Sequence, residues 1–78
     1  MTRYEVNKKI RLILEILTVE IGPAIDYTSQ SITHYEKGIG SVKLQAKIEW
    51  YLDKQINECI DPDLKDICMR LKELRHHQ

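Results

Sequence analysis

The sequence predicts an all-α protein, a compact bundle of about five helices in a single domain of 78 residues. Apolar residues recur at spacings of three and four along most of the chain, which is the pattern of helices with one buried face. Residues that typically start or stop helices divide this pattern into segments. No segment alternates apolar and polar residues as a half-buried strand does. A chain this short buries only about 60% of its unfolded surface, so a second copy would add stability by covering an apolar stripe.

The composition excludes several classes of protein. With 42% hydrophobic and 31% charged residues, the chain is too apolar to be disordered and too charged for a membrane span. It has no run of about 18 apolar residues and no apolar stretch before a cleavage site, so we expect a cytoplasmic protein without membrane contact. The 12 basic and 12 acidic residues give zero net charge, which argues against strong non-specific binding to nucleic acid. Specific binding needs only a local basic rim.

The first helix is expected from Arg3 to Ile16. Lys8 and Lys9 lie on its polar side, and Arg11 lies at the edge of its apolar stripe. That stripe keeps helical spacing. Its residues are Val6, Ile10, Ile13, Leu14 and Leu17.

A shorter second helix is expected to begin near Thr18, whose side chain suits an N-cap. Its inward residues would be Ile21, Ala24 and Ile25. Pro23 removes a backbone donor and clashes with the carbonyl four residues back unless it lies in the first turn. The second helix is therefore expected to be distorted or to start late.

The third helix is expected to begin after Thr28 as its cap and to end at Gly38. Ile32 and Tyr35 are three residues apart and would hold one face of this helix against the core. A short turn at Asp26 precedes the helix.

The two C-terminal helices are predicted over 41–60 and 62–76. Ser41 precedes the first of them, Asp61 caps the second, and Pro62 suits its first position. The first buries a helical stripe of Leu44, Ile48, Tyr51 or Leu52, Ile56, and Cys59 or Ile60. The second carries a narrower stripe, too short to indicate a coiled coil, that serves either dimerisation or packing on the first and fourth helices. This stripe consists of Leu64, Ile67, Leu71 and Leu74.

The segment from about 17 to 38 resembles the helix-turn-helix of the Xre family of phage-repressor-like and Cro-like regulators. Its most specific part is the ending Ser31-Ile-Thr-His-Tyr-Glu-Lys-Gly38, and the alignment runs without a gap from Arg11. The resemblance is good over the first half of the chain and holds only in outline over the second half. It implies a lambda-repressor-like fold and a reading helix that enters the major groove of DNA.

The resemblance also implies structural roles. Gly22 stands where the family has a small residue, because the two helices of the motif approach closely there. Asp26 holds the turn position commonly occupied by glycine, and aspartate tolerates left-handed backbone better than most residues. Arg11 and Glu36 match positions that often form an ion pair. The alternative for Glu36 is a solvated carboxylate at a helix end.

The face of the third helix opposite its apolar side carries small hydrogen-bonding groups without fixed charge. Gln30 is the strongest candidate for base contact, because its amide pairs two-fold with adenine. His34 lies one turn further and would reach a base or a phosphate. Helix starts suit phosphate contacts, and lysines after the helix would form a basic rim. The predicted DNA-binding residues are Thr18, Thr28, Ser29, Gln30, Thr33, His34, Lys37 and Lys43; without the flanking motif, these would form an ordinary solvent-facing surface.

Other chemistry has little support in the sequence. Cys59 and Cys68 are expected to be reduced, small apolar fillers on helices. The histidines His34, His76 and His77 do not combine with cysteines or carboxylates at metal-ligand spacing. We therefore predict no enzymatic activity, no cofactor and no metal. Trp50 and the tyrosines are too dispersed for a base-stacking platform and are expected in the core or at an interface.

The functional hypothesis is a repressor-like, sequence-specific DNA-binding regulator that binds double-stranded DNA as a homodimer. The alternative is a helical protein-binding adaptor or antirepressor on the same scaffold, without DNA binding. Zero net charge, the absence of arginine on the reading helix and the Gly22-Pro23 pair favour this alternative.

Overall fold

The computed structural model describes residues 1–76, and this part of the chain contains five α-helices, a short 3-10 helix and no strand. The all-α prediction is therefore confirmed. His77, considered from the sequence as a metal ligand, lies outside the described residues. The helices are α1 (Arg3–Ile13), α2 (Thr18–Ala24), α3 (Ser29–Glu36), α4 (Val42–Glu58) and α5 (Pro62–Glu73), followed by η1 (Leu74–His76).

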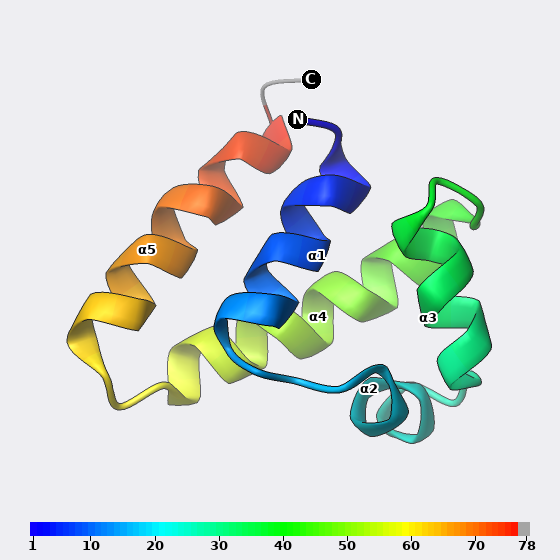
Figure 1. The fold of residues 1–78 in the computed structure, drawn as a ribbon, viewed down its shortest axis with the longest axis horizontal. Helices are drawn as coiled ribbons and strands as arrows, with labels where there is room; N and C mark the ends of the chain where they lie inside the picture. The colour runs from blue at the N-terminus through cyan, green and yellow to red at the C-terminus, as the bar shows by residue number, and fades with distance from the viewer. Residues whose placement is uncertain (77–78) are drawn as a thin grey trace.

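Two groups of helices share one core. α1 and α5 lie side by side and run in opposite directions, and α4 passes behind α1 (Figure 1). α2 and α3 pack on each other at the other end of α4. The core joins both groups and consists of Val6, Ile10, Ile16, Ile21, Ile25, Ile32, Tyr35, Leu44, Ile48, Leu52, Ile56 and Cys68.

Three helices begin at side-chain caps that the sequence indicated. The hydroxyl of Thr28 accepts from the Ser31 amide at 3.1 Å, and the hydroxyl of Ser41 accepts from the Leu44 amide at 3.0 Å. Asp61 caps α5 by accepting from the amides of residues 63 and 64 at 2.9 and 3.2 Å, and Pro62 is the first helical residue. Each cap satisfies amides that the helix itself leaves without a partner.

Three helices end with one residue in left-handed backbone. These residues are Glu15 (φ 57°) after α1, Asp26 (φ 64°) after α2 and Gly38 (φ 93°) after α3. In each case two amides turn back to carbonyls of the last turn, as when the Tyr27 amide donates to the Gly22 carbonyl at 2.8 Å. The expectations for Asp26 and Gly38 are confirmed. Glu15 was not expected, and it ends α1 at Ile13 instead of Ile16.

The prediction that Thr18 caps α2 is wrong. Leu17 is the N-cap residue, and Thr18 is the first residue inside the helix. The Leu17 amide donates to Glu20 Oε1 at 3.2 Å, so a carboxylate satisfies the start of this helix instead of a threonine hydroxyl. Leu17 is 59% exposed because the chain has already left α1, so it does not belong to the apolar stripe of that helix.

The end of α2 also differs in part from the expectation. Ile21 and Ile25 are buried as predicted, but Ala24 is exposed. Pro23 lies inside the helix, which ends one residue later. Pro23 has no amide to donate to the carbonyl four residues back, and α2 is short but still packs its buried face on α3.

The two C-terminal helices are shorter than predicted. α4 ends at Glu58, so that Ile60, expected as a buried alternative to Cys59, is 98% exposed. On α5, Cys68 is fully buried and Leu71 packs against the core, whereas Ile67 is 45% exposed. The face of α5 that carries Cys68 and Leu71 therefore points to the core, and Ile67 lies at the border of that face. Packing thus uses part of the predicted stripe, and dimerisation through the remainder stays a prediction.

A buried polar network, which the sequence did not reveal, joins α1, α3, α4 and η1. Asn7 Nδ2 donates to both Glu49 Oε2 and Tyr35 Oη at 2.9 Å. Arg3 donates to both Glu49 carboxylate oxygens at 2.7 Å. Arg75, only 5% exposed, donates from Nε to Asn7 Oδ1 at 2.7 Å. Four elements thus meet at one set of charged and polar groups.

The network changes the proton affinity of two of its members. Burial opposes the charge of Glu49, but hydrogen bonds from Arg3 and Asn7 and the positive charge of Arg75 outweigh it, so the pKa of Glu49 is lowered. Burial raises the pKa of Tyr35 to about 12, with the Asn7 hydrogen bond acting against it. Glu49 is therefore held as a carboxylate and Tyr35 as a neutral phenol.

The first prediction concerns acid. Because the pKa of Glu49 is lower in the folded protein than the value of about 4.3 in an unfolded chain, the stability it contributes is present above that value. That stability is lost as the pH falls through the folded pKa. Glu49→Gln should lower the free energy of unfolding by about 3 kcal/mol at pH 7, since Arg3 loses its carboxylate partner and Arg75 keeps only Asp53.

Urea unfolding at about pH 7 and about pH 3 tests this expectation. The difference between Glu49→Gln and the parent protein should shrink at the lower pH. Glu58→Gln, an exposed change on the same helix, should stay within about 0.5 kcal/mol of the parent. An undiminished difference at acid pH would show that the charge of Glu49 is not what stabilises the fold.

Candidate nucleic-acid interface

α2 and α3 are joined by four residues, 25–28, and approach each other closely at Gly22. A Cβ atom at Gly22 would lie 2.6 Å from the Tyr27 carbonyl oxygen and 3.1 Å from the Ser29 amide nitrogen. Ile25, which follows α2, and Ile32 of α3 are both buried. The expected reason for a small residue at Gly22 is thus confirmed, because backbone occupies the space of a side chain.

The inner face of α3 is fixed by packing and hydrogen bonds. Ile32 is fully buried and Tyr35 is 4% exposed, as the spacing of these two residues predicted. The Tyr35 hydroxyl donates to Gln45 Oε1 at 2.6 Å and accepts from Asn7. α3 is therefore tied through one phenol to both α1 and α4.

Arg11 holds the C-terminal end of α3 against α1. It donates from Nε and Nη2 to the two carboxylate oxygens of Glu36 at 2.6 and 2.9 Å, which is the ion pair expected from the sequence. Arg11 Nη1 also donates to the Ile16 carbonyl at 2.8 Å. The exposed fractions of the two side chains are 12% and 9%, so this pair is shielded from water much more than a surface pair.

The outer face of α3 carries the predicted base-contacting residues. Gln30, Thr33 and His34 are exposed, and Ser29 is half-buried at the start of the helix. Thr33 Oγ1 donates to the Ser29 carbonyl at 3.1 Å. Within residues 1–76, the side chains of Gln30 and His34 make no hydrogen bond, so both are available to a ligand. The structure thus brings these four residues together on one surface.

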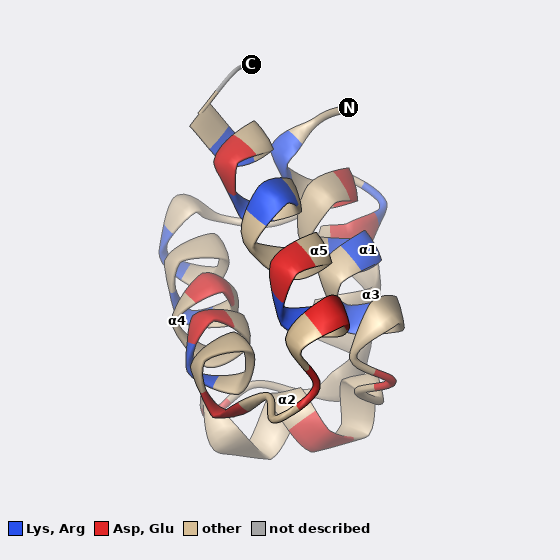
Figure 2. Ribbon diagram, turned by 90° about the vertical axis from the view of Figure 1, so that its left-hand side faces the viewer, with Lys and Arg blue, Asp and Glu red and all other residues tan. Residues whose placement is uncertain are grey.

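The residues predicted to contact phosphates lie around this surface in unequal positions. Lys37, the residue after α3, and Lys43, in the first turn of α4, are both exposed. Thr28 caps α3, but its hydroxyl also lies 3.0 Å from the Ser31 hydroxyl. Thr18 is half-buried and is the first residue of α2, so what it brings to a phosphate contact is its position at a helix start. Figure 2 shows both basic and acidic segments along α4.

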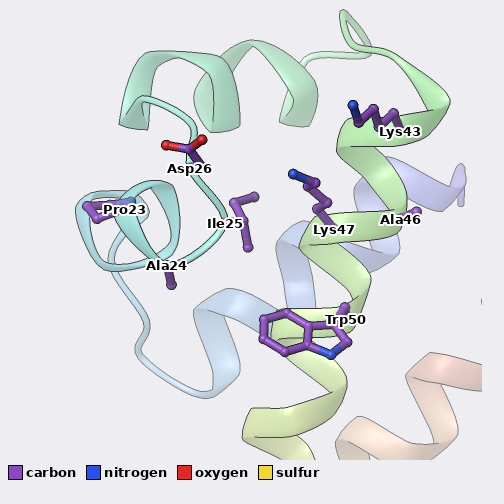
Figure 3. A pocket seen from close by; sticks show the side chains of 8 residues that line it. All are labelled: Pro23, Ala24, Ile25, Asp26, Lys43, Ala46, Lys47 and Trp50. Atoms are coloured by element: carbon purple, nitrogen blue, oxygen red, sulfur yellow. The ribbon is translucent and has the colours of Figure 1, made fainter.

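A groove of about 530 Å³ lies between the end of α2 and one face of α4 (Figure 3). Trp50 lies at one end of the groove and is 58% exposed, so it is not a core residue. Its place at an interface, the other expectation from the sequence, stays a prediction. The groove is lined by Pro23, Ala24, Ile25, Asp26, Lys43, Ala46, Lys47 and Trp50.

The sequence contains a signal for this groove. Lys43, Lys47, Trp50 and Lys54 follow one another at spacings of four, three and four, which places them on one side of α4. This basic and aromatic stripe is distinct from the buried apolar stripe of the same helix. The apolar residues of α4 alone do not indicate this second stripe.

Other sites find little support within residues 1–76. No group of three histidine, cysteine or carboxylate residues lies in a position to hold a metal, and no helix is long and apolar enough to cross a membrane. Both cysteines are free thiols, and burial raises the pKa of Cys68. Cys68 is a core residue, as expected, whereas Cys59 is only half-buried.

Comparison with known proteins leaves the family open. No protein-family model, curated protein or solved structure matches this chain. The resemblance to Xre-family regulators therefore stands on the sequence motif alone.

Gly22→Ala tests the contact between α2 and α3. Helix propensity alone would make alanine the more stable residue by about 1 kcal/mol. Because the added Cβ would meet backbone at 2.6 Å, we expect a loss of about 2 kcal/mol instead. The sign of the change in urea unfolding decides between the two. Ala24→Gly, an exposed change in the same helix, should cost no more than about 1 kcal/mol and calibrates the propensity.

Glu36→Gln tests the anchor of α3. The variant leaves the shielded guanidinium of Arg11 without its carboxylate, and we expect unfolding free energy to fall by about 3 kcal/mol. Asp66→Asn is the control, because it breaks an exposed ion pair in which the side chains of Asp66 and Arg70 are 61% and 80% exposed. It should lower the free energy of unfolding by no more than about 0.5 kcal/mol. Equal losses in the two variants, measured by chemical unfolding, would contradict a special role for the Arg11 pair.

Proposed function

We propose that the chain is a sequence-specific DNA-binding transcriptional regulator, repressor-like, that reads an operator with the outer face of α3. The observation that carries this proposal is the division of α3 into two faces. Ile32, Tyr35 and Glu36 hold the inner face to the body of the protein. Gln30 and His34 on the outer face are exposed and without hydrogen bonds to residues 1–76.

The outer face suits base edges in the major groove. The Gln30 amide both donates and accepts, and it pairs two-fold with the N6 and N7 atoms of adenine. His34 lies one turn along the helix and reaches a neighbouring base or a phosphate. Ser29 and Thr33 carry hydroxyls, and the Thr33 hydroxyl retains acceptor capacity while it donates to a backbone carbonyl.

Phosphate contacts would set the register of the protein on the duplex. The amides at the start of α3 beside Thr28, and those at the start of α2 near Thr18, suit phosphate oxygens. Lys37 and Lys43 add positive charge at the edge of α3. With so few cations, affinity would fall only modestly with salt, and base contacts would supply a large part of the selectivity.

Two copies of the chain would bind together. The expected dimer contact lies on α5 and the start of η1, where Ile67 and Leu74 are 45% and 40% exposed, and it would include Leu64 and Leu71. Two reading helices related by a two-fold axis would contact half-sites about 34–36 Å apart. The operator would then be an inverted repeat.

Selection of bound duplexes from a random DNA pool, followed by electrophoretic mobility shifts, tests the proposal. We expect an inverted repeat with an adenine in each half-site. Gln30→Ala should cost about 1–3 kcal/mol on that site and relax the choice of the adenine, because the amide pairing is lost. Lys37→Ala should weaken binding to all sequences alike and reduce the slope of log K against log salt by about one unit.

Lys65→Ala on α5 is the matched control and should leave binding and the salt slope unchanged. Enrichment of single half-sites would contradict the dimer but not the reading of DNA by α3. The DNA-binding proposal fails if no sequence is retained at low salt, or if Gln30→Ala combined with His34→Ala selects the same sites as the parent.

A further inference from the structure

We propose that the groove between α2 and α4 binds an acidic, partly apolar segment of a partner protein. This inference does not depend on DNA binding: Lys43 serves in both proposals, but Lys47 and Trp50 have no part in the proposed operator contacts. It rests on the apolar floor of the groove, the cations along one wall and the way in which those cations are held.

The floor of the groove provides the kind of surface found at the centre of protein interfaces. Figure 3 shows Ala24 and Ile25 on the α2 side facing Lys47 and Trp50 on α4. Ile25 is buried beneath the surface, and the indole of Trp50 stands 58% exposed at one end. Exposed tryptophan beside small apolar residues is typical of positions that contribute most to binding between proteins. An aliphatic or aromatic side chain of a partner would bury this surface.

The α4 wall of the groove carries an excess of positive charge. Lys43 and Lys47 line the groove. Lys54 lies one turn beyond Trp50, in a neighbouring hollow that it shares with Asp53 and Glu58. The three lysines lie along one side of α4 and span on the order of 16 Å at 1.5 Å per residue. Among the described residues that line the groove, Asp26 is the only carboxylate. Asp53, next to Lys54, is already paired with Arg75 at 2.7 Å and with Lys72 at 3.6 Å. The unpaired charge therefore favours a partner with carboxylates.

Two of these cations lie against aromatic rings. The Lys47 ammonium is 5.5 Å from the centre of the Tyr27 ring, and the Lys54 ammonium is 5.6 Å from the centre of the Trp50 ring. Such contacts favour a lysine that stays near the apolar surface instead of extending into water. Carboxylates that flank an apolar side chain would meet cations already placed beside the floor.

These features fit a protein segment better than a DNA backbone. Phosphates need cations and amides, but they leave an apolar floor and a half-exposed indole unused. A helical partner segment of about 11 residues, or a shorter extended one, covers the groove and reaches Lys54 beyond it. Binding of DNA in this groove is therefore the competing outcome that the experiment must separate.

Selection of peptides from a random 12-residue display library on the immobilised full chain tests the proposal. We expect enriched peptides with at least two aspartates or glutamates near a leucine or an aromatic residue. A synthetic peptide of the enriched sequence should shift the emission of Trp50, the single tryptophan of the chain, because it covers the indole. Replacing its acidic residues by asparagine and glutamine should weaken binding at least tenfold.

Two variants and one control place the peptide in the groove. Lys47→Glu and Ala46→Glu should each weaken binding at least tenfold, and their helical content by circular dichroism shows whether they fold. Lys8→Glu makes the same charge change on the exposed side of α1 and should bind like the parent. The two variants test the groove independently. Ala46→Glu changes an exposed residue, and it keeps Lys47 while adding a negative charge to the groove.

Several results would overturn the proposal. They are a failure to enrich peptides, enrichment without acidic residues, and equal binding by the Lys47→Glu and Lys8→Glu proteins. A random DNA duplex that shifts Trp50 emission, with loss of the shift in Lys47→Glu, would assign the groove to DNA. The groove could instead bind the exposed loop at Ile60 of a second copy of the chain, which carries acidic residues on both sides of Ile60. Trp50 emission that changes with protein concentration, and loses this change in Ile60→Ala, would assign the groove to that loop.

Discussion

The carboxylate of Glu49 is the group around which the helices are arranged. It lies in the middle of α4, where burial opposes its charge, and its hydrogen bonds to Arg3 and Asn7 offset that cost. Arg75 adds a third contact from the C-terminal turn. A buried charge without partners would be far more costly than the network that surrounds it. The position of α1 and of the chain after α5 therefore satisfies one buried charge as well as the apolar core.

The same network determines how α3 is presented. Asn7 binds both Glu49 and the Tyr35 hydroxyl, so the packing of α1 on α4 also sets the place of α3. The pair of Arg11 and Glu36 fixes the far end of that helix. All of these contacts use one side of α3. The opposite side is left with side chains that the fold does not need, which is what makes it a candidate for recognition.

The part of the structure that could be predicted from sequence is the part governed by local chemistry. Thr28 and Asp61 start helices, and Gly38 and Asp26 end them, because the required bonds reach only a few residues along the chain. Glu15 escaped prediction because glutamate is rarely chosen for left-handed backbone. Neighbouring bonds, not an intrinsic preference, hold it there.

Contacts between distant segments account for the larger misses. Arg75 reads as an ordinary tail residue, and its burial follows from partners 68 and 22 positions away, Asn7 and Asp53. The inward turn of α5 follows as well, since placing Arg75 and Cys68 inside moves Ile67 to the edge. In the candidate site, the pairing of Arg11 with Glu36 was foreseeable from the resemblance, but the groove beside Trp50 needed the placement of α2 against α4.

The charge balance of the chain shows why a sum over the sequence says little about binding. All four arginines form ion pairs, so the carboxylates of Glu36, Glu49, Asp53 and Asp66 are neutralised within the described fold. Within residues 1–76, Lys37, Lys43, Lys47 and Lys54 have no carboxylate partner. Three of these lysines lie along one side of α4, and the fourth follows α3. A chain with zero net charge thus still presents unpaired positive charge along one side of α4 and after α3, where either a phosphate or an acidic partner would meet it.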